Sequence, residues 1–300
     1  MIKSNACLIN SNWLIRHLAL LSMVLVVSYA RAGEPAGLKP RQLVMLAKAA
    51  KERYWSTIYS FNINTYRFIK VGDRRKRVLQ SKCRQLWRWT PWRIYCHSID
   101  TFQSSAGLGA MKNDIFDSFD GTSTTYMVIT AHANQAWSQG WSHCQINHGN
   151  QVLGSLVDTI WGSWLWMEVT NTNSKVLWDS RSHQYILDQV LDAKSKMPLR
   201  YRTWIDPDRG YVVTRNDSSS GGKVFIYYRY RHWHEVKKGL WLPFQFSYGD
   251  PGVIENICRI QRVVEINKAI PPSELNVKIP NGTSVYNTVT DHVYHKGKKS

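Results

Sequence analysis

A two-residue alternation of side chains fills the second half of the chain and most constrains its fold. Between residues 184 and 267, runs such as LRYRTWID, KVFIYYRYRHWHEV and LWLPFQFSY are separated by short turns such as DPDRG, NDSSSGG and KKG. A period of two places alternate side chains on opposite faces of a strand. Tight connections pair consecutive strands antiparallel. We therefore predict an antiparallel meander with one apolar face.

The stretch YYRYRHWHEVKKGLWLPFQFSY, residues 227–248, mixes rings with cations and could be a stacking platform for nucleic acid. Its alternation separates Arg229 and Arg231 from an apolar set on the second strand, namely Leu240, Leu242, Phe244, Phe246 and Tyr248. A single-strand platform needs rings and cations together on one exposed face, and a face as apolar as this one is unstable in water. We interpret the apolar set as the wall of a core or cavity and predict no nucleic-acid partner. Pro243 indicates an edge or bulged strand.

The first half predicts a helix followed by further strands. Pro40 suits a first helical turn, and an apolar stripe follows it at helical spacing: Leu43, Leu46, Ala47, Ala50 and Tyr54. Strand patterns begin at residue 56, GDRRKR reads as a basic turn, and SSAGLGAMKND reads as a loop. The segment 151–167 has helical spacing and predicts a second, very apolar helix that contains Trp161 and Trp164. The expected fold is α+β, a curved antiparallel sheet with an N-terminal helix and a central lid helix on its concave face.

Residues 1–32 resemble an export signal. Lys3 and Arg16 precede the apolar run 18–27, and Ala30 and Ala32 offer small residues before a cleavage site at Gly33. The run is too short to span a bilayer comfortably, although an uncleaved anchor is the alternative. We expect a periplasmic or secreted single domain over 33–295 with a basic tail at 296–300. The chain carries a formal net charge of +18, which attracts anionic partners such as a membrane surface.

Four cysteines follow the predicted signal: Cys83, Cys96, Cys144 and Cys258. Export permits disulfides, and three pairings are possible. Cys83 and Cys96 flank the expected turn at Thr90, so a bridge across that hairpin is the first expectation.

Candidate catalytic and metal-binding patterns are weak. The acids of DIFDSFDGTS do not have the spacing of a calcium loop, and Asp120-Gly121 is a common turn pair. The spacing of His143, Cys144 and His148 matches no standard zinc site. No G-x-S-x-G motif is present, and a set of isolated acids has no evident partners: Glu168, Asp179, Glu235 and Glu255. We predict no metal, no cofactor and no catalytic residue.

Three C-terminal stretches resemble the LolA/LolB-like lipoprotein carrier superfamily, whose architecture RseB-type periplasmic sensors share. They are VLDAKSKMPLRYR (190–202), GLWLPFQF (239–246) and EINKAIPPSELNVKIPNGTSVY (265–286). Lys196 stands where a glycine is common and Leu275 where Phe is usual, and the Trp-rich middle has no counterpart. The resemblance implies a half-barrel, lidded by helices, around an apolar hollow that holds acyl chains, with no catalytic residues.

Together these patterns predict an exported, non-enzymatic protein that binds a lipid or lipoprotein acyl chain in trafficking across the cell envelope. The apolar set at 240–248 would line the hollow, Trp161 and Trp164 would lie on the lid, and the basic surface would dock to anionic membrane. One alternative is an RseB-like sensor or scaffold that contacts a membrane protein. The other is a hydrolase of envelope polysaccharide, in which two of the isolated acids would act together.

Overall fold

The computed structural model describes residues 37–54, 56–71, 73–90, 93–103, 110–136, 141–148, 173–191 and 193–297. The predicted signal and its cleavage site lie outside these residues. The predicted lid helix, with Trp161 and Trp164, and the end of the basic tail also lie outside them. Among the helices of the described ranges, none has the length and apolar character needed to cross a bilayer.

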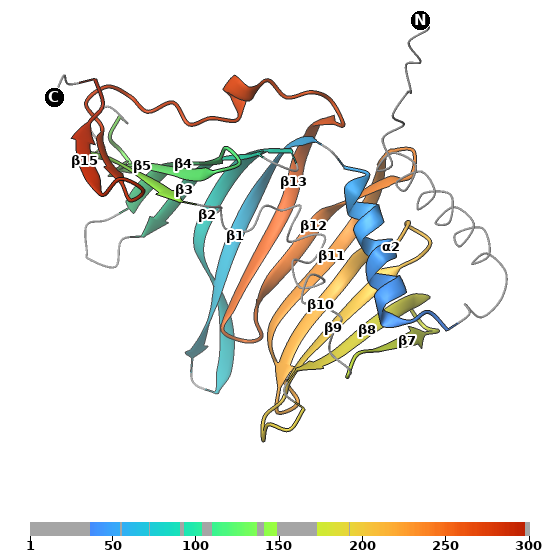
Figure 1. Ribbon diagram of the computed structural model, residues 1–300. Coiled ribbons are helices and arrows are strands. Elements are labelled where there is room, and N and C mark those ends of the chain that lie inside the picture. Colours follow the sequence, from blue (N-terminus) through green and yellow to red (C-terminus); the bar gives the residue numbers. More distant parts are fainter. Residues whose placement is uncertain are drawn as a thin grey trace, which may run out of the picture.

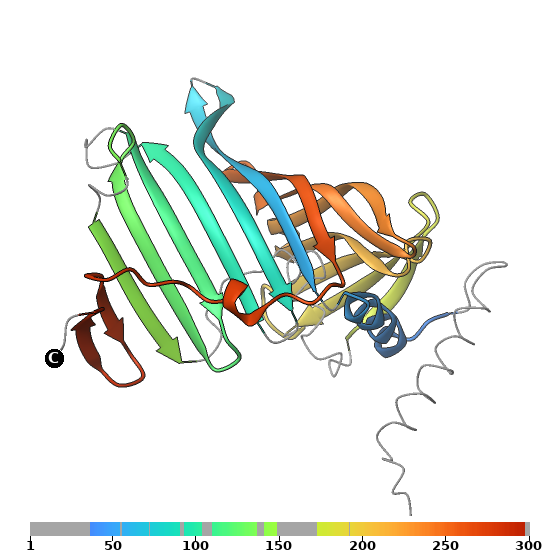
Figure 2. The ribbon, with the colours of Figure 1, turned by 90° about the horizontal axis from the view of Figure 1, so that it is seen from above.

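The strands of the described residues form one curved sheet (Figures 1 and 2). Within these residues the sheet has 15 strands in the order β15-β14-β6-β5-β4-β3-β2-β1-β13-β12-β11-β10-β9-β8-β7. Their bounds are β1 Thr57–Val71, β2 Arg74–Thr90, β3 Arg93–Gln103, β4 Ala110–Phe119, β5 Ser123–His132, β6 Trp141–His148, β7 Lys175–Asp179, β8 Gln184–Leu191, β9 Leu199–Asp206, β10 Val212–Ser220, β11 Lys223–Lys237, β12 Leu240–Asp250, β13 Ile254–Ile266, β14 Ser284–Asn287 and β15 His292–His295.

Two antiparallel meanders meet at the centre of this sheet. Strands β1 to β6 form one wing and β7 to β13 form the other, and the first strand of one wing pairs with the last strand of the other. That junction pairs Thr57 with Ile266 and Arg67 with Ile254. The predicted meander is confirmed, and the curved sheet agrees with the predicted half-barrel. The pairing of β14 with β6 is parallel, which the sequence did not indicate.

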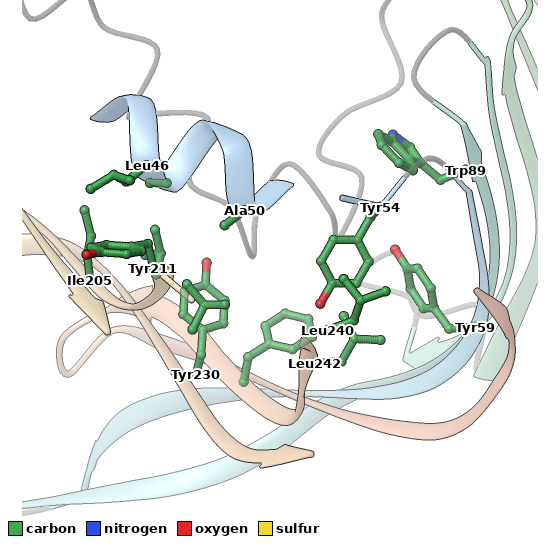
Figure 3. Packing of buried hydrophobic residues seen from close by; sticks show 14 of the residues in the cluster. Leu46, Ala50, Tyr54, Tyr59, Trp89, Ile205, Tyr211, Tyr230, Leu240 and Leu242 are labelled. Atoms are coloured by element: carbon green, nitrogen blue, oxygen red, sulfur yellow. The ribbon is translucent and has the colours of Figure 1, made fainter. Parts of the chain in front are cut away.

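The N-terminal helix α2, Pro40–Glu52, packs on the β7–β13 wing (Figure 1). Its start is stabilised because the Gln42 side chain accepts a hydrogen bond of 2.9 Å from the Lys39 backbone N–H. Figure 3 shows its apolar stripe above sheet residues of the same buried cluster, among them Ile205, Tyr230, Leu240 and Leu242. We call the sheet face that carries α2 the inner face and the opposite one the outer face.

The end of α2 is fastened to the sheet by three hydrogen bonds. The Tyr54 hydroxyl donates to the Trp241 carbonyl at 2.7 Å. The Arg53 side chain donates to the Gly210 carbonyl at 2.9 Å, and the Asn267 amide donates to the Arg53 carbonyl at 2.8 Å. These bonds fix where the helix ends over the inner face.

A C-terminal strap, residues 267–283, crosses the other wing on its outer face (Figure 2). It contains a short 3₁₀ helix, Pro272–Glu274, and Glu274 pairs with Arg88 at 3.3 Å. Leu275 is buried, and a small apolar cluster forms beneath the strap from Met127, Cys144, Val285, Phe116, Ile146, Val277 and Ile279. The strap therefore covers part of the outer face of the β1–β6 wing, as α2 covers part of the inner face of the β7–β13 wing.

Several predicted loops are strand. Strand β4 begins at Ala110, within the stretch read as a loop, and the arginines of GDRRKR belong to β2. Strand β10 continues through NDSSS to Ser220, and only Gly221 and Gly222 turn, with φ of 54° and 79°. A polar side chain is accommodated within β10 because the buried Asp217 forms ion pairs with Arg215 and Arg229.

Two details of the 227–248 hairpin also differ from prediction. His232 has a φ of 53°, which interrupts the alternation, so that Trp233 packs against the core while His234 is exposed. Strand β12 lies between β11 and β13 and is not an edge strand. Pro243 is tolerated because the β12–β13 ladder begins only at Gln245.

The predicted disulfide between Cys83 and Cys96 is wrong. Cys83 lies opposite Asp100 and Cys96 lies opposite Trp87, so the two are offset by four positions along the hairpin. That offset corresponds to about 13 Å, whereas a bridge requires Cα atoms within about 7 Å. All four cysteines of the described residues are free thiols.

We expect Leu43→Ala to lower the free energy of unfolding by about 2 to 5 kcal/mol, because Leu43 is fully buried between α2 and the sheet. Met45→Ala on the exposed side of the same helix should change it by less than about 0.5 kcal/mol. Urea denaturation followed by tryptophan fluorescence measures both. Equal effects of the two substitutions would contradict the packing of α2 on the inner face.

Candidate ligand-binding site on the inner face

The five apolar residues predicted to line a cavity lie on β12, beside or beneath α2. Leu240, Leu242 and Phe246 are 6%, 3% and 2% exposed and belong to the main buried cluster. Phe244 and Tyr248 are partly buried and pack against that cluster. The structure therefore brings all five to one apolar cluster with the helix, and Figure 3 shows Leu240 and Leu242 of this set. Their contact with a ligand stays a prediction.

Aromatic side chains of β11 and β12 continue this apolar cluster along the two strands. Tyr230 lies opposite Phe246 and Tyr228 opposite Tyr248 on neighbouring strands. The rings of Tyr228 and Tyr248 stack with centroids 5.7 Å apart, and those of Phe246 and Tyr248 with centroids 6.3 Å apart. We call these four residues the aromatic strip.

The strip continues across the central strands through small apolar side chains. Cys258 lies opposite Phe246, Ile63 opposite Cys258, and Cys83 opposite Ile63. Burial raises the pKa of the Cys83 thiol to about 12 and raises that of Cys258 well above its usual range. Burial likewise raises the pKa of Tyr248 and Tyr230. Desolvation by the surrounding side chains is the main cause in each case.

Beyond the strip, the ends of β1, β2, β3 and β13 border an open hollow of about 670 Å³. Five of its lining residues are apolar: Ile69, Val78, Leu79, Phe102 and Ile254. The others are polar: Thr65, Arg67, Gln80, Ser81 and Asp100. Alternation along β1 and β3 places most of these side chains on the inner face with Ile63. We call this the inner hollow; its volume lies in the range of small-molecule sites.

The inner hollow was not predicted, because its residues flank the segment read as a basic turn. The spacing of Thr65, Arg67, Ile69 and Val71 in one strand was the available signal. This spacing indicated that the four side chains share one face of their strand. It did not indicate that β1 pairs with β13, whose Ile254 completes the lining.

The acids of DIFDSFDGTS do not gather into a calcium site. Asp114 lies on the outer face, with its carboxylate 2.5 Å from His97 Nε2. Asp117 lies on the inner face opposite Cys96 and Tyr126, where burial raises its pKa to about 6. Asp120 forms the predicted turn. Burial acts to raise its pKa, but hydrogen bonds donated by Ser123 and Thr122 outweigh burial and lower the pKa to about 2.

The remaining candidates for catalysis or metal binding have structural partners. Glu235 accepts a hydrogen bond of 2.6 Å from the Gly239 N–H, and Glu255 pairs with Arg77 at 2.9 Å. Asp179 accepts from Ser182 at 2.7 Å. Glu168 and the His148 side chain lie outside the described residues. In the described part of the chain, no three His, Cys, Asp or Glu side chains gather as a metal site would require.

Comparison with solved structures finds a likeness in fold. No protein family matches the sequence, and no curated protein matches it. The structure is similar to a crystal structure of a domain provisionally described as an outer membrane lipoprotein-sorting protein, from Vibrio parahaemolyticus. The two are 11% identical with a TM-score of 0.40, and the match covers 79% of this chain and 97% of the other.

We expect Asp117→Asn to stabilise the protein at pH 8 by up to about 3 kcal/mol, a gain that disappears below about pH 4. The folded pKa of Asp117 is about 6, against 3.8 for an ordinary aspartate. The folded state therefore binds the proton more tightly, and ionisation as the pH rises through 6 costs stability. Thermal or urea unfolding between pH 4 and 8 measures this. A stabilisation that does not change with pH would contradict a buried, desolvated carboxyl.

Proposed function

We propose that this protein is an exported, non-enzymatic carrier in the cell envelope that binds the acyl chain of a lipid or lipoprotein on its inner face. The observation that carries the proposal is that the inner hollow and the aromatic strip are neighbours on the inner face: Tyr248 lies opposite Asn256, which lies opposite Thr65 of the hollow. Together they offer an elongated, largely apolar surface that runs from the strand ends toward α2. An extended hydrocarbon chain has the complementary shape and chemistry.

The binding energy would come from burial of methylene groups, each worth about 0.8 kcal/mol. Val78, Phe102 and Ile254 would contact the chain in the inner hollow. Arg67, in the same lining, would pair with an anionic headgroup or carboxylate. Tyr248 and Phe244, which are only partly buried, would extend the contact toward α2.

Leu240, Leu242 and Phe246 would form the wall beneath α2, where a bound chain reaches them only if the helix moves aside. Trp161 and Trp164 are proposed, on the sequence pattern alone, as part of a lid.

The proposed carrier would meet anionic membrane through a projecting hairpin, residues 68–80. The β1–β13 ladder ends at Arg67 and the β2–β3 ladder begins at Ser81, so these residues extend beyond the neighbouring strands (Figure 2). Ile69, Val71 and Leu79 are 40%, 55% and 42% exposed, beside a set of exposed cations: Lys70, Arg74, Arg75, Lys76 and Arg77. A bilayer surface offers apolar contact and anionic charge together, and the inner hollow opens at the base of this hairpin.

We expect Phe102→Ser to weaken the binding of a fluorescent fatty acid by about tenfold or more, because an aromatic side chain leaves the inner hollow. Ile99→Ser is the matched control: Ile99 is 39% exposed on the outer face of the same strand, so this variant should bind as the unmodified protein does. Fluorescence titration measures both. Absence of fatty-acid binding by the unmodified protein, with no lipid found by native mass spectrometry, would refute the proposed function.

We expect the variant K70Q/R74Q/K76Q to bind vesicles that contain anionic lipid at least about tenfold more weakly, since each cation near such a surface contributes about 1 kcal/mol. The variant K194Q/K196Q/K223Q removes three exposed charges at other turns and should bind nearly normally. Vesicle sedimentation measures both. Equal losses would assign the attraction to net charge and not to the projecting hairpin.

A further inference from the structure

Arginines recur on every second strand across the outer face of the central sheet. Arg231 of β11 lies opposite Gln245 of β12, which lies opposite Arg259 of β13. Arg259 lies opposite Asn62 of β1, and Asn62 opposite Arg84 of β2. Their sequence neighbours Tyr230, Phe246, Cys258 and Cys83 belong to the inner face, so this row points outward. With strands about 4.8 Å apart, successive arginines are about 10 Å apart. We call these five residues the outer arginine row.

The row has unbalanced positive charge. Arg84, Arg231 and Arg259 are exposed, and within the described part of the chain none of them forms an ion pair. Lys82 and Arg262, in adjoining positions of the same face, are also exposed.

Acids elsewhere on the outer face are already paired. Asp188 pairs with Arg200 at 2.5 Å, and Glu255 pairs with Arg77 at 2.9 Å. Asp217 is held between Arg215 and Arg229. The arginines that pair with acids thus lie outside the row, and the three arginines of the row have no acid partner among the described residues.

Two aromatic rings on this face, Tyr66 and Tyr227, already lie against arginines. The Arg77 guanidinium lies 3.8 Å from the ring centroid of Tyr66, and that of Arg229 lies 5.1 Å from the ring centroid of Tyr227. Nucleic-acid binding to single strands depends on open rings. The row itself contains no apolar side chain that would favour insertion into a bilayer.

The residues of the row suit a hydroxyl-rich polyanion. A guanidinium matches a carboxylate in planar, bidentate geometry. The amides of Gln245 and Asn62, between the arginines, can donate to and accept from hydroxyl groups. We propose that the outer arginine row binds a linear acidic polysaccharide, with the carboxylates of the chain on Arg231, Arg259 and Arg84. The chain would lie across the strands, and its binding does not depend on an acyl chain on the inner face.

The test uses polygalacturonate as the probe and the full-length mature protein. We expect R84Q/R231Q/R259Q to bind polygalacturonate at least about tenfold more weakly than the unmodified protein does. We expect N62A/Q245A to lose a few-fold in affinity. K194Q/K196Q/K223Q, with the same loss of net charge, should lose less than about threefold. Fluorescence titration of the fatty acid on each variant shows that the inner face is intact and separates this proposal from the proposed function.

Three results would overturn the proposal. One is an equal loss in the two triple variants, which would show attraction by net charge alone. Another is stronger binding of a single-stranded oligonucleotide than of polygalacturonate, with the same dependence on the row. The third is a loss of binding to anionic vesicles that matches the loss for the polysaccharide, which would assign the row to membrane docking.

Discussion

The pairing of β1 with β13 is the contact on which the rest of the structure depends. It joins residues about two hundred positions apart into one antiparallel ladder, from Thr57 with Ile266 to Arg67 with Ile254. Without it the two meanders would be separate sheets, each with an additional open edge. The inner hollow needs it, because Ile254 closes a lining that β1, β2 and β3 begin. The outer arginine row needs it as well, because it crosses this junction.

The two faces of the sheet are covered by different parts of the chain. Helix α2 covers the inner face of the β7–β13 wing through Leu43, Leu46 and Ala50, and the strap covers part of the outer face of the other wing through Leu275. Each cover buries apolar side chains that an isolated sheet would expose to water. Where neither cover reaches, the described residues of the inner face carry the inner hollow, and those of the outer face carry the outer arginine row. This division places one candidate surface on each side of the same strands.

The sequence predicted the local elements well and the long-range arrangement poorly. Helix α2 and the meander of the second half followed from periodicity, which depends only on neighbouring residues. The turn at Asp120 and Gly121 followed from turn chemistry. The disulfide between Cys83 and Cys96 failed because symmetry about a turn does not give the register of the hairpin. The polar end of β10 was misread because Asp217 is buried with arginines from two strands, a partnership that no local pattern contains.

The candidate site was predicted only in part, because local patterns do not show which strands become neighbours. The apolar residues of β12 were recognised from their alternation, and the structure gathers them with α2. The inner hollow escaped recognition because charged letters such as Lys70 and Arg74 dominate the hairpin that leads to it. Its apolar members come from strands that become neighbours only in the folded sheet. Alternation identifies a face of one strand, and it does not say which other strands share that face.

The late position of β13 and β14 in the chain has a consequence for the order of folding. Val285 of β14 completes the cluster with Met127 and Cys144, and β13 completes the ladder of β1. The N-terminal wing therefore lacks its neighbours until nearly the whole chain is available. Such high contact order slows folding, and it leaves the chain without a finished wing while synthesis proceeds.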